Sequence, residues 1–228
     1  MTELDFESWA KEFKNPLWYL KLSPIWQKLL QGVQELPEEE KDRIKNQVAD
    51  FVEQKLIAGE IALGSEIGSW DTERKPIDTI VIHHTSGNPG LSYNRLSAAE
   101  LIRLYAPHYA ANIKDKPISS GHVRNSKQIF WPYHWIIRTD GKYERLLEDD
   151  ETGWQSGNWN VNCCSVAIVF DNDYENSTPS DTEIDACREI ISKYAGCQIL
   201  GHQEVNPKTV CPSNLFLGEN GWKKKLVV

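Results

Sequence analysis

Two histidines and one cysteine stand where metal chemistry is possible. His83 ends an apolar, β-branched run, His202 follows a glycine, and Cys211 comes nine positions later, directly before a proline. Two imidazoles and one thiolate are preferred ligands of Zn²⁺, and three protein ligands leave the fourth position of a tetrahedral ion open for water. The residue types therefore predict a catalytic zinc site rather than a structural one.

The charge of such a site indicates its chemistry. With a single thiolate the metal keeps a net charge near +1, which polarises an amide carbonyl and lowers the pKa of bound water toward about 7. The eight residues between His202 and Cys211 are enough to fold back toward the strand that ends in His83. We therefore expect hydrolysis of an amide by zinc-activated water.

Five short apolar segments are expected to form the strands that position these residues. Two of them flank a Thr139-Asp140-Gly141 turn and are typical of a hairpin. The expected strands are Ile77–His83, Tyr133–Ile137, Tyr143–Leu147, Ser165–Phe170 and Gln198–Leu200.

Helices are expected between the strands. Ser97 with Glu100 and Ser180 with Glu183 have the spacing of capping boxes, so each pair predicts the start of a helix. Residues Ala106 to Gln128 lack periodicity and predict a long irregular excursion. Strands interleaved with helices predict an α/β fold with a central mixed β-sheet flanked by helices.

The N-terminal part has a helical pattern of its own. A helix is expected from Pro37 to Gly59, and Ser23 before Pro24 is a candidate N-cap. Glycine, serine and charged residues without periodicity then indicate a linker. We therefore divide the chain into an N-terminal helical extension of unknown role, residues 1–70, and a catalytic domain, residues 71–228.

Composition excludes several classes of partner. The 228 residues carry a net charge of −8, the wrong sign for a protein that neutralises nucleic-acid phosphates. No apolar run approaches the ~18 residues of a membrane span, and the acidic N-terminus does not fit a secretory signal. Five cysteines are too few for a disulfide framework. We expect a soluble protein that is cytoplasmic at synthesis.

Three segments resemble the family of zinc-dependent N-acetylmuramoyl-L-alanine amidases and peptidoglycan recognition proteins. They read IVIHHT at 80–85, YHWIIRTDG at 133–141 and GHQEVNPKTVCP at 201–212. The resemblance spans about Ile77 to Phe216 and leaves the N-terminal helices unmatched. It implies Zn²⁺ as cofactor, with His83, His202 and Cys211 as its ligands.

The same resemblance implies two catalytic residues, Tyr133 and Thr209. A phenol at Tyr133 donates a hydrogen bond to an oxyanion or helps to move a proton, and Thr209 assists the same oxygen or holds the water. Each has a plain structural alternative, because tyrosines are common in strands and a threonine in a Pro-Lys-Thr loop is often a turn residue.

Peptidoglycan or a muropeptide is the substrate that the resemblance implies. The residues expected to bind it are His84, Trp154, Gln155 and Asn158. Many relatives have a histidine where this chain has Gln155, which cannot titrate. His84 and His134 each neighbour a motif residue along a strand, so their side chains are expected on the opposite face, which favours packing or support of a ligand over metal binding.

Three functions stay open at this point. The first is hydrolysis of the bond between N-acetylmuramic acid and L-alanine. The second is a module that binds peptidoglycan without cleaving it, which in this family typically lacks the cysteine that Cys211 supplies here. The third is cleavage of a different amide or peptide bond. An amidase made in the cytoplasm would act on the cell wall after release, or on wall fragments inside the cell.

Overall fold

The computed structural model describes residues 4–65 and 70–227 and divides into two compact units. The first unit comprises the described residues of Met1–Ser69 together with Ser92–Phe130, and the second those of Trp70–Leu91 and Trp131–Val228. Of the helices in these residues, none combines the length and apolar composition that crossing a bilayer requires.

A five-stranded sheet lies at the centre of the second unit, in the order β5-β4-β6-β1-β7. Neighbouring strands run parallel except for the β4–β5 hairpin. The sheet is therefore mixed, and the expected α/β fold is confirmed. The strands are β1 (Thr79–His84), β4 (Trp135–Ile137), β5 (Tyr143–Arg145), β6 (Ser165–Phe170) and β7 (Gln198–Gly201).

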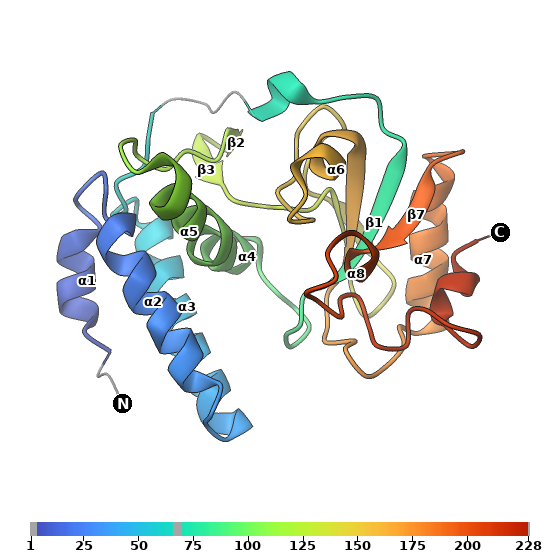
Figure 1. Cartoon of the computed structure of the whole chain (residues 1–228), viewed down its shortest axis with the longest axis horizontal. Coiled ribbons are helices and arrows are strands. Elements are labelled where there is room, and N and C mark those ends of the chain that lie inside the picture. Colours follow the sequence, from blue (N-terminus) through green and yellow to red (C-terminus); the bar gives the residue numbers. More distant parts are fainter. Residues whose placement is uncertain (1–3, 66–69, 228) are drawn as a thin grey trace. The chain divides into compact units, whose positions relative to one another are not determined.

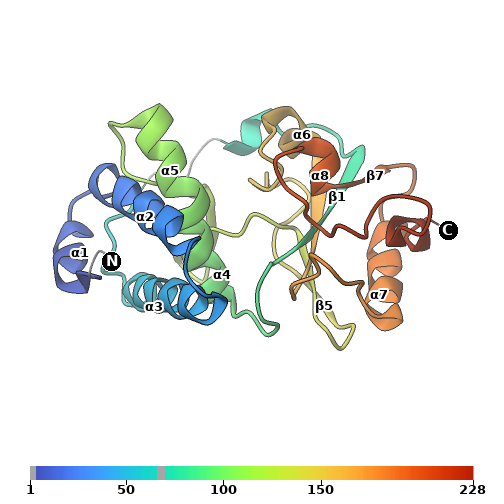
Figure 2. The same ribbon diagram turned by 60° about the horizontal axis from the view of Figure 1, so that its bottom comes forward.

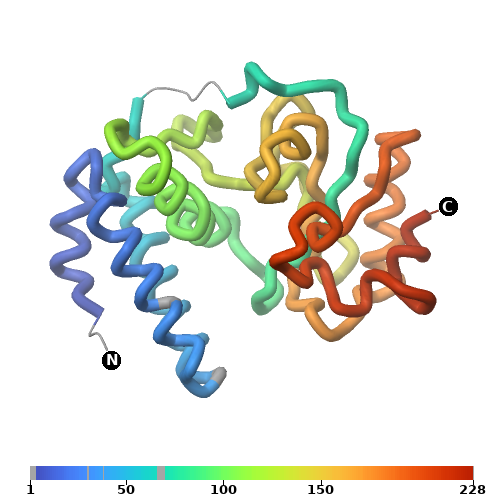
Figure 3. Tube along the Cα trace, viewed as in Figure 1, coloured from blue at the N-terminus to red at the C-terminus, as the bar shows by residue number. Residues whose placement is uncertain are grey.

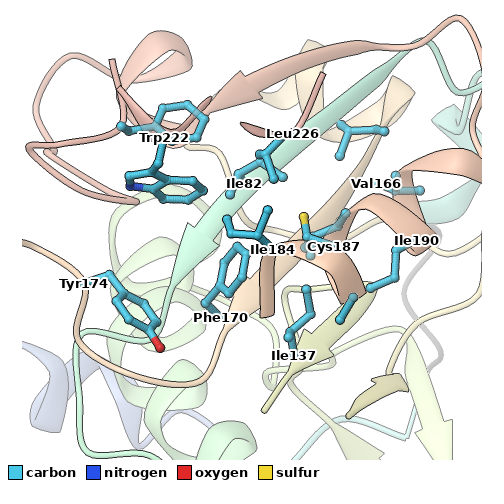
Figure 4. Close-up of a cluster of buried hydrophobic side chains, with 14 residues drawn as sticks. Ile82, Ile137, Val166, Phe170, Tyr174, Ile184, Cys187, Ile190, Trp222 and Leu226 are labelled. Atoms are coloured by element: carbon cyan, nitrogen blue, oxygen red, sulfur yellow. The ribbon is translucent and has the colours of Figure 1, made fainter. Parts of the chain in front are cut away.

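The two central strands are buried along their whole length. Every residue of β1 and β6 is buried, as the continuous apolar runs predicted. Helix α7 (Asp181–Ser192) covers one face of the sheet (Figure 1), and it begins with the expected capping box of Ser180 and Glu183. Figure 4 shows the core between this helix, the sheet and the C-terminal segment; its members include Ile82, Phe170, Tyr174, Ile184, Ile190 and Trp222.

Four short helical segments complete the described part of the second unit. Helix α8 begins directly after β7, the edge strand that pairs with β1 (Figure 2). The segments are η1 (Trp70–Glu73), α6 (Trp159–Cys164), α8 (His202–Val205) and η4 (Trp222–Lys225).

The first unit is mainly helical, and its core is aromatic. Rings of Phe13, Trp18 and Trp26 lie 5.0–6.0 Å apart between centroids. Trp18 is fully buried, and its indole nitrogen donates to the Ala62 carbonyl at 3.1 Å. The elements are α1 (Phe6–Glu12), α2 (Tyr19–Val33), α3 (Glu38–Ile57), α4 (Tyr93–Glu100), η2 (Leu101–Tyr105), α5 (Ala106–His108), η3 (Tyr109–Ile113), β2 (His122–Arg124) and β3 (Lys127–Ile129).

Two expected helix starts in this unit are wrong. Helix α2 begins at Tyr19, so that Ser23 and Pro24 lie inside it, because burial of Trp18, Tyr19 and Leu22 outweighs the local proline signal. Helix α4 begins after Ser92, whose hydroxyl accepts from Arg95 N.

Residues Ala106 to Gln128 are also more ordered than expected. Helical turns continue from α4 to Ile113, and β2 and β3 then pair as a hairpin. Figure 3 shows this stretch of chain beside the N-terminal helices. Contacts of α3 with α4 and of α2 with α5 explain why Ser92–Phe130 belongs to the first unit. The compact units thus differ from the expected segments 1–70 and 71–228, and the boundary of the catalytic domain stays a prediction.

Candidate metal centre

The three predicted ligands meet at one edge of the sheet. His83 is the fifth residue of β1, and His202 is the first residue of α8, directly after β7. Because β1 and β7 are parallel and pair Ile82 with Gly201, the residues after this pair lie side by side. Cys211 reaches the same place on the loop that follows α8.

The ligand atoms are close enough for one ion. His83 Nδ1 lies 3.7 Å from Cys211 Sγ, and the rings of His83 and His202 lie 4.6 Å apart between centroids. The ligand atoms of all three residues lie within 4.8 Å of one another. His83 and Cys211 are buried, with 1% and 8% of their surfaces exposed, whereas His202 is half-buried.

This geometry fits zinc. In a tetrahedral site with Zn–N near 2.0–2.1 Å and Zn–S near 2.3 Å, a nitrogen and a sulfur ligand are about 3.5 Å apart. The 3.7 Å between His83 Nδ1 and Cys211 Sγ is close to that spacing. Two nitrogens and one sulfur also form a donor set that zinc prefers, and three ligands leave one position open for a water or a substrate oxygen.

Backbone hydrogen bonds hold the cysteine loop against α8. Gln203 N donates to the Cys211 carbonyl at 2.7 Å, and Cys211 N donates to Thr209 Oγ1 at 3.1 Å. Gly201 allows the close packing at this point, because a Cβ there would lie 2.6 Å from the Phe216 ring and 2.9 Å from Pro212. Thr209, expected to be catalytic, thus has a visible structural role as the acceptor for the amide of Cys211.

Gln155 contacts the far side of the His83 ring. Its Oε1 lies 2.6 Å from His83 Nε2, and its Nε2 donates to Ser165 Oγ at 3.0 Å. Gln155 is buried, with 6% of its surface exposed. The sequence predicted Gln155 as a substrate-binding residue, and the structure places it against His83, one of the predicted metal ligands.

Tyr133 also lies beside His83. Their ring centroids are 5.1 Å apart, and 5% of Tyr133 is exposed. The expectation that Tyr133 lies in a strand is wrong, because β4 begins at Trp135 and Tyr133 belongs to the segment before it. This segment packs closely on Gly153, where a Cβ would come within 2.2 Å of the Pro132 carbonyl oxygen.

The other three expected substrate-binding residues lie in different surroundings. His84 is buried, and its Nδ1 accepts from Tyr174 N at 2.9 Å. Asn158 is exposed and caps α6, because its Oδ1 accepts from the amides that follow. Trp154 is half-buried and makes edge-to-face contacts with two further tryptophans, Trp70 and Trp159, at 4.7 and 6.2 Å between centroids. Their role in binding substrate stays a prediction.

His134 is the other histidine beside a motif residue, and it is fully buried. Its Nδ1 accepts from Ala167 N at 3.1 Å, and its Nε2 donates to the Glu151 carbonyl at 3.0 Å. Burial, with the nearby charge of Arg74 acting in the same direction, lowers the pKa of His134 to about 3. His134 is therefore a neutral, structural histidine.

Ser165 and Arg74 support the site and were not anticipated from the sequence. Ser165 Oγ accepts from Gln155, and the Arg74 guanidinium donates to the backbone carbonyl of Ser165 at 2.8 Å. Burial lowers the pKa of Arg74. The two contacts join residues 10 and 91 positions apart, so no local pattern marks them.

Comparison with known proteins gives one family and several similar structures. The family described as N-acetylmuramoyl-L-alanine amidase matches residues 73–214. No curated protein was found to match the chain.

Three of the similar solved structures are an amidase, a phage endolysin and a peptidoglycan recognition protein. The N-acetylmuramoyl-L-alanine amidase LysC from Clostridium intestinale URNW is 18% identical, with 69% of this chain and 85% of that chain covered and a TM-score of 0.48. The Ph2119 endolysin from the Thermus scotoductus MAT2119 bacteriophage is 18% identical, with 66% and 83% covered and a TM-score of 0.44. Drosophila peptidoglycan recognition protein SD is 20% identical, with 64% and 83% covered and a TM-score of 0.41.

Proposed function

Because the chain belongs to the N-acetylmuramoyl-L-alanine amidase family, we propose that it is a zinc-dependent enzyme that hydrolyses the bond between N-acetylmuramic acid and L-alanine. The observation that carries the proposal is the convergence of His83, His202 and Cys211, whose ligand atoms lie within 4.8 Å of one another. Zinc in this position would activate a water and polarise the amide carbonyl.

The residues around the ligands have distinct tasks in this proposal. Tyr133, beside the ring of His83, donates a hydrogen bond from its phenol to the amide oxygen as negative charge develops there. Thr209 fixes the loop that presents Cys211, through the hydrogen bond from Cys211 N. The family resemblance also suggests that the Thr209 hydroxyl assists the same amide oxygen or holds the attacking water.

Peptidoglycan or a muropeptide is the proposed substrate. The net charge of −8 gives no long-range attraction to an anionic cell wall, so recognition depends on a shaped surface. Trp154 is the proposed contact for a sugar ring or for the peptide stem, because an aromatic face packs well on either.

Cys211 separates this proposal from a module that binds peptidoglycan without cleaving it. A binding module needs the fold and the surface but no third metal ligand. Here the cysteine is present, its side chain is 8% exposed, and its sulfur faces His83. This observation favours catalysis.

The bond cleaved is identified by product analysis. The purified chain with one equivalent of zinc is incubated with a muramoyl-peptide, and the products are identified by mass spectrometry and by labelling of new amino termini. The expected products are the intact sugar and a peptide that begins with L-alanine. Binding without cleavage would contradict the proposal in favour of a recognition module, and a new terminus elsewhere in the peptide would contradict the assigned bond.

A further inference from the structure

The side chain of Gln155 forms a buried link between a metal ligand and the sheet. It joins His83 Nε2, at 2.6 Å, to Ser165 Oγ, at 3.0 Å. The exposed fractions of the three residues are 1% for His83, 6% for Gln155 and 0% for Ser165. Water does not compete for these hydrogen bonds, so the partners of each polar atom are determined by the protein.

The positions of the protons follow from the chemistry of the groups. A neutral imidazole carries one N–H, and its other nitrogen is an acceptor. Gln155 Oε1 is an acceptor only, so the proton on His83 lies on Nε2 and is donated to Gln155. Nδ1 then presents a lone pair, and Nδ1 is the atom that faces Cys211 Sγ at 3.7 Å.

The Gln155 amide makes a second hydrogen bond on the side away from His83. Its Nε2 is a donor only, and it points to Ser165 Oγ. Ser165 is the first residue of β6 and pairs with Thr79 of β1, the strand that carries His83. Its backbone carbonyl accepts from Arg74 at 2.8 Å. The acceptor for His83 is therefore linked to β6, a strand that is buried along its whole length.

We propose that Gln155 is a positioning residue that holds His83 in the tautomer with its proton on Nε2 and its Nδ1 lone pair directed at the metal centre. The metal part of this inference rests on the proposed function, whereas the tautomer itself does not. A ligand histidine usually gives its second N–H to a carboxylate, a backbone carbonyl or a water. Here a neutral side-chain amide takes that place, and among the three residues that would hold the metal only Cys211, as a thiolate, would carry a negative charge.

Nuclear magnetic resonance of the metal-free chain tests the tautomer. Long-range ¹H–¹⁵N correlations of ¹⁵N-histidine-labelled protein distinguish a proton on Nε2 from one on Nδ1. We expect His83 to be protonated on Nε2 in the native chain and in Gln155→Glu, whose carboxylate also accepts. In Gln155→Leu the acceptor is lost, and we expect a mixture of both tautomers. A proton on Nδ1 in the native chain, or no change in Gln155→Leu, would overturn the proposal.

Zinc affinity, measured by competition with a chelator, gives the second readout. Loss of such a supporting partner typically weakens metal binding about 10–100-fold, which is the decrease expected for Gln155→Leu. We expect Gln155→Glu to bind zinc as tightly as the native chain or more tightly. Ser165→Ala, which keeps the acceptor but releases the amide, is expected to give a smaller decrease; native affinity in Gln155→Leu would overturn the proposal.

A matched control distinguishes an effect on the position of His83 from a general loss of stability. Gln128 is a half-buried glutamine of the first unit, and its amide also makes two hydrogen bonds, to Gly64 O at 2.6 Å and from Ser120 N at 2.9 Å. We expect Gln128→Leu to lower stability and to leave the His83 tautomer and the zinc affinity unchanged. The two proposals can fail separately. If His83 shows the Nε2 tautomer and this depends on Gln155, but the chain has no amidase activity, only the proposed function is contradicted.

Discussion

The two compact units of this protein use their buried aromatic and polar groups differently. In the first unit, Trp18 and its neighbours fill a core, and the indole nitrogen is satisfied by a backbone carbonyl. In the second, buried polar side chains converge at the ends of β1 and β7, where the His83 ring contacts Gln155 on one side and Cys211 on the other. Packing accounts for the aromatic cluster of the first unit. In the second unit, the possible ligand atoms of His83, His202 and Cys211 lie close together. We therefore assign the chemistry to the second unit.

The largest effect is expected from removal of the thiolate. Cys211→Ala leaves two ligands, so we expect loss of stoichiometric zinc and at least a ~10³-fold decrease in amidase activity. Cys187→Ala is the matched control, because Cys187 is a fully buried thiol in the core of the same unit, and burial raises its pKa so that it stays protonated. This control is expected to lose stability and to keep zinc. Normal zinc content and activity in Cys211→Ala would contradict the assignment of the chemistry to the second unit.

In the first unit, a core mutation is expected to change stability alone. Trp18→Ala should lower the free energy of unfolding by about 3–5 kcal/mol, because a fully buried indole and its hydrogen bond are lost. Below its unfolding transition the variant should bind zinc as the native chain does. Chemical denaturation and a zinc titration on the same sample measure both quantities. Altered zinc affinity in the folded variant would show that the chemistry is not confined to the second unit.

Tyr133→Phe sharpens the comparison within the second unit. Loss of one hydrogen-bond donor to a developing oxyanion typically costs about 10²–10³-fold in kcat. Since the ring beside His83 is kept, zinc content and thermal stability should change little. Steady-state kinetics with the muramoyl-peptide checks the expectation. Unchanged kcat would assign Tyr133 to packing, the plain alternative that the sequence left open.

The smallest effect concerns pH and the second buried histidine, His134. Its pKa is lowered to about 3 in the folded chain, against about 6.5 when unfolded, so the unfolded state binds the extra proton between these values. Stability from this group is therefore complete above pH 6.5 and falls by about 1.4 kcal/mol per pH unit as the pH drops toward 3. Denaturation at pH 7 and pH 5 should show a larger decrease for the native chain than for His134→Gln. Equal decreases would mean that His134 titrates normally.

Much of the site was predictable because its chemistry is local in sequence. His83 at the end of an apolar run, and the Gly-His and Cys-Pro pairs, can be recognised without a fold, and the structure brings them together. The strands of the central sheet were largely predictable for the same reason, since Ser165–Phe170, with apolar residues from Val166 on, forms a strand with the expected bounds.

The parts that were not predictable depend on long-range contacts. Ser97 and Glu100 have the spacing of a capping box, but in the folded chain Ser97 Oγ accepts from Phe130 N at 2.8 Å and Glu100 is buried beside Arg103. The role of Gln155 is of the same kind, because its partners His83 and Ser165 lie 72 and 10 positions away. Propensity and spacing do not report such contacts.

Titration of the metal-free chain with zinc, followed by amidase activity at each point, tests the central claim most directly. The account predicts that activity is absent without metal, rises in proportion to added zinc and reaches its plateau at one equivalent per chain, with a muramoyl-peptide as substrate. Activity that is independent of zinc, or a chain that binds no zinc at one equivalent, would contradict the assignment of His83, His202 and Cys211 as the ligands of a catalytic metal.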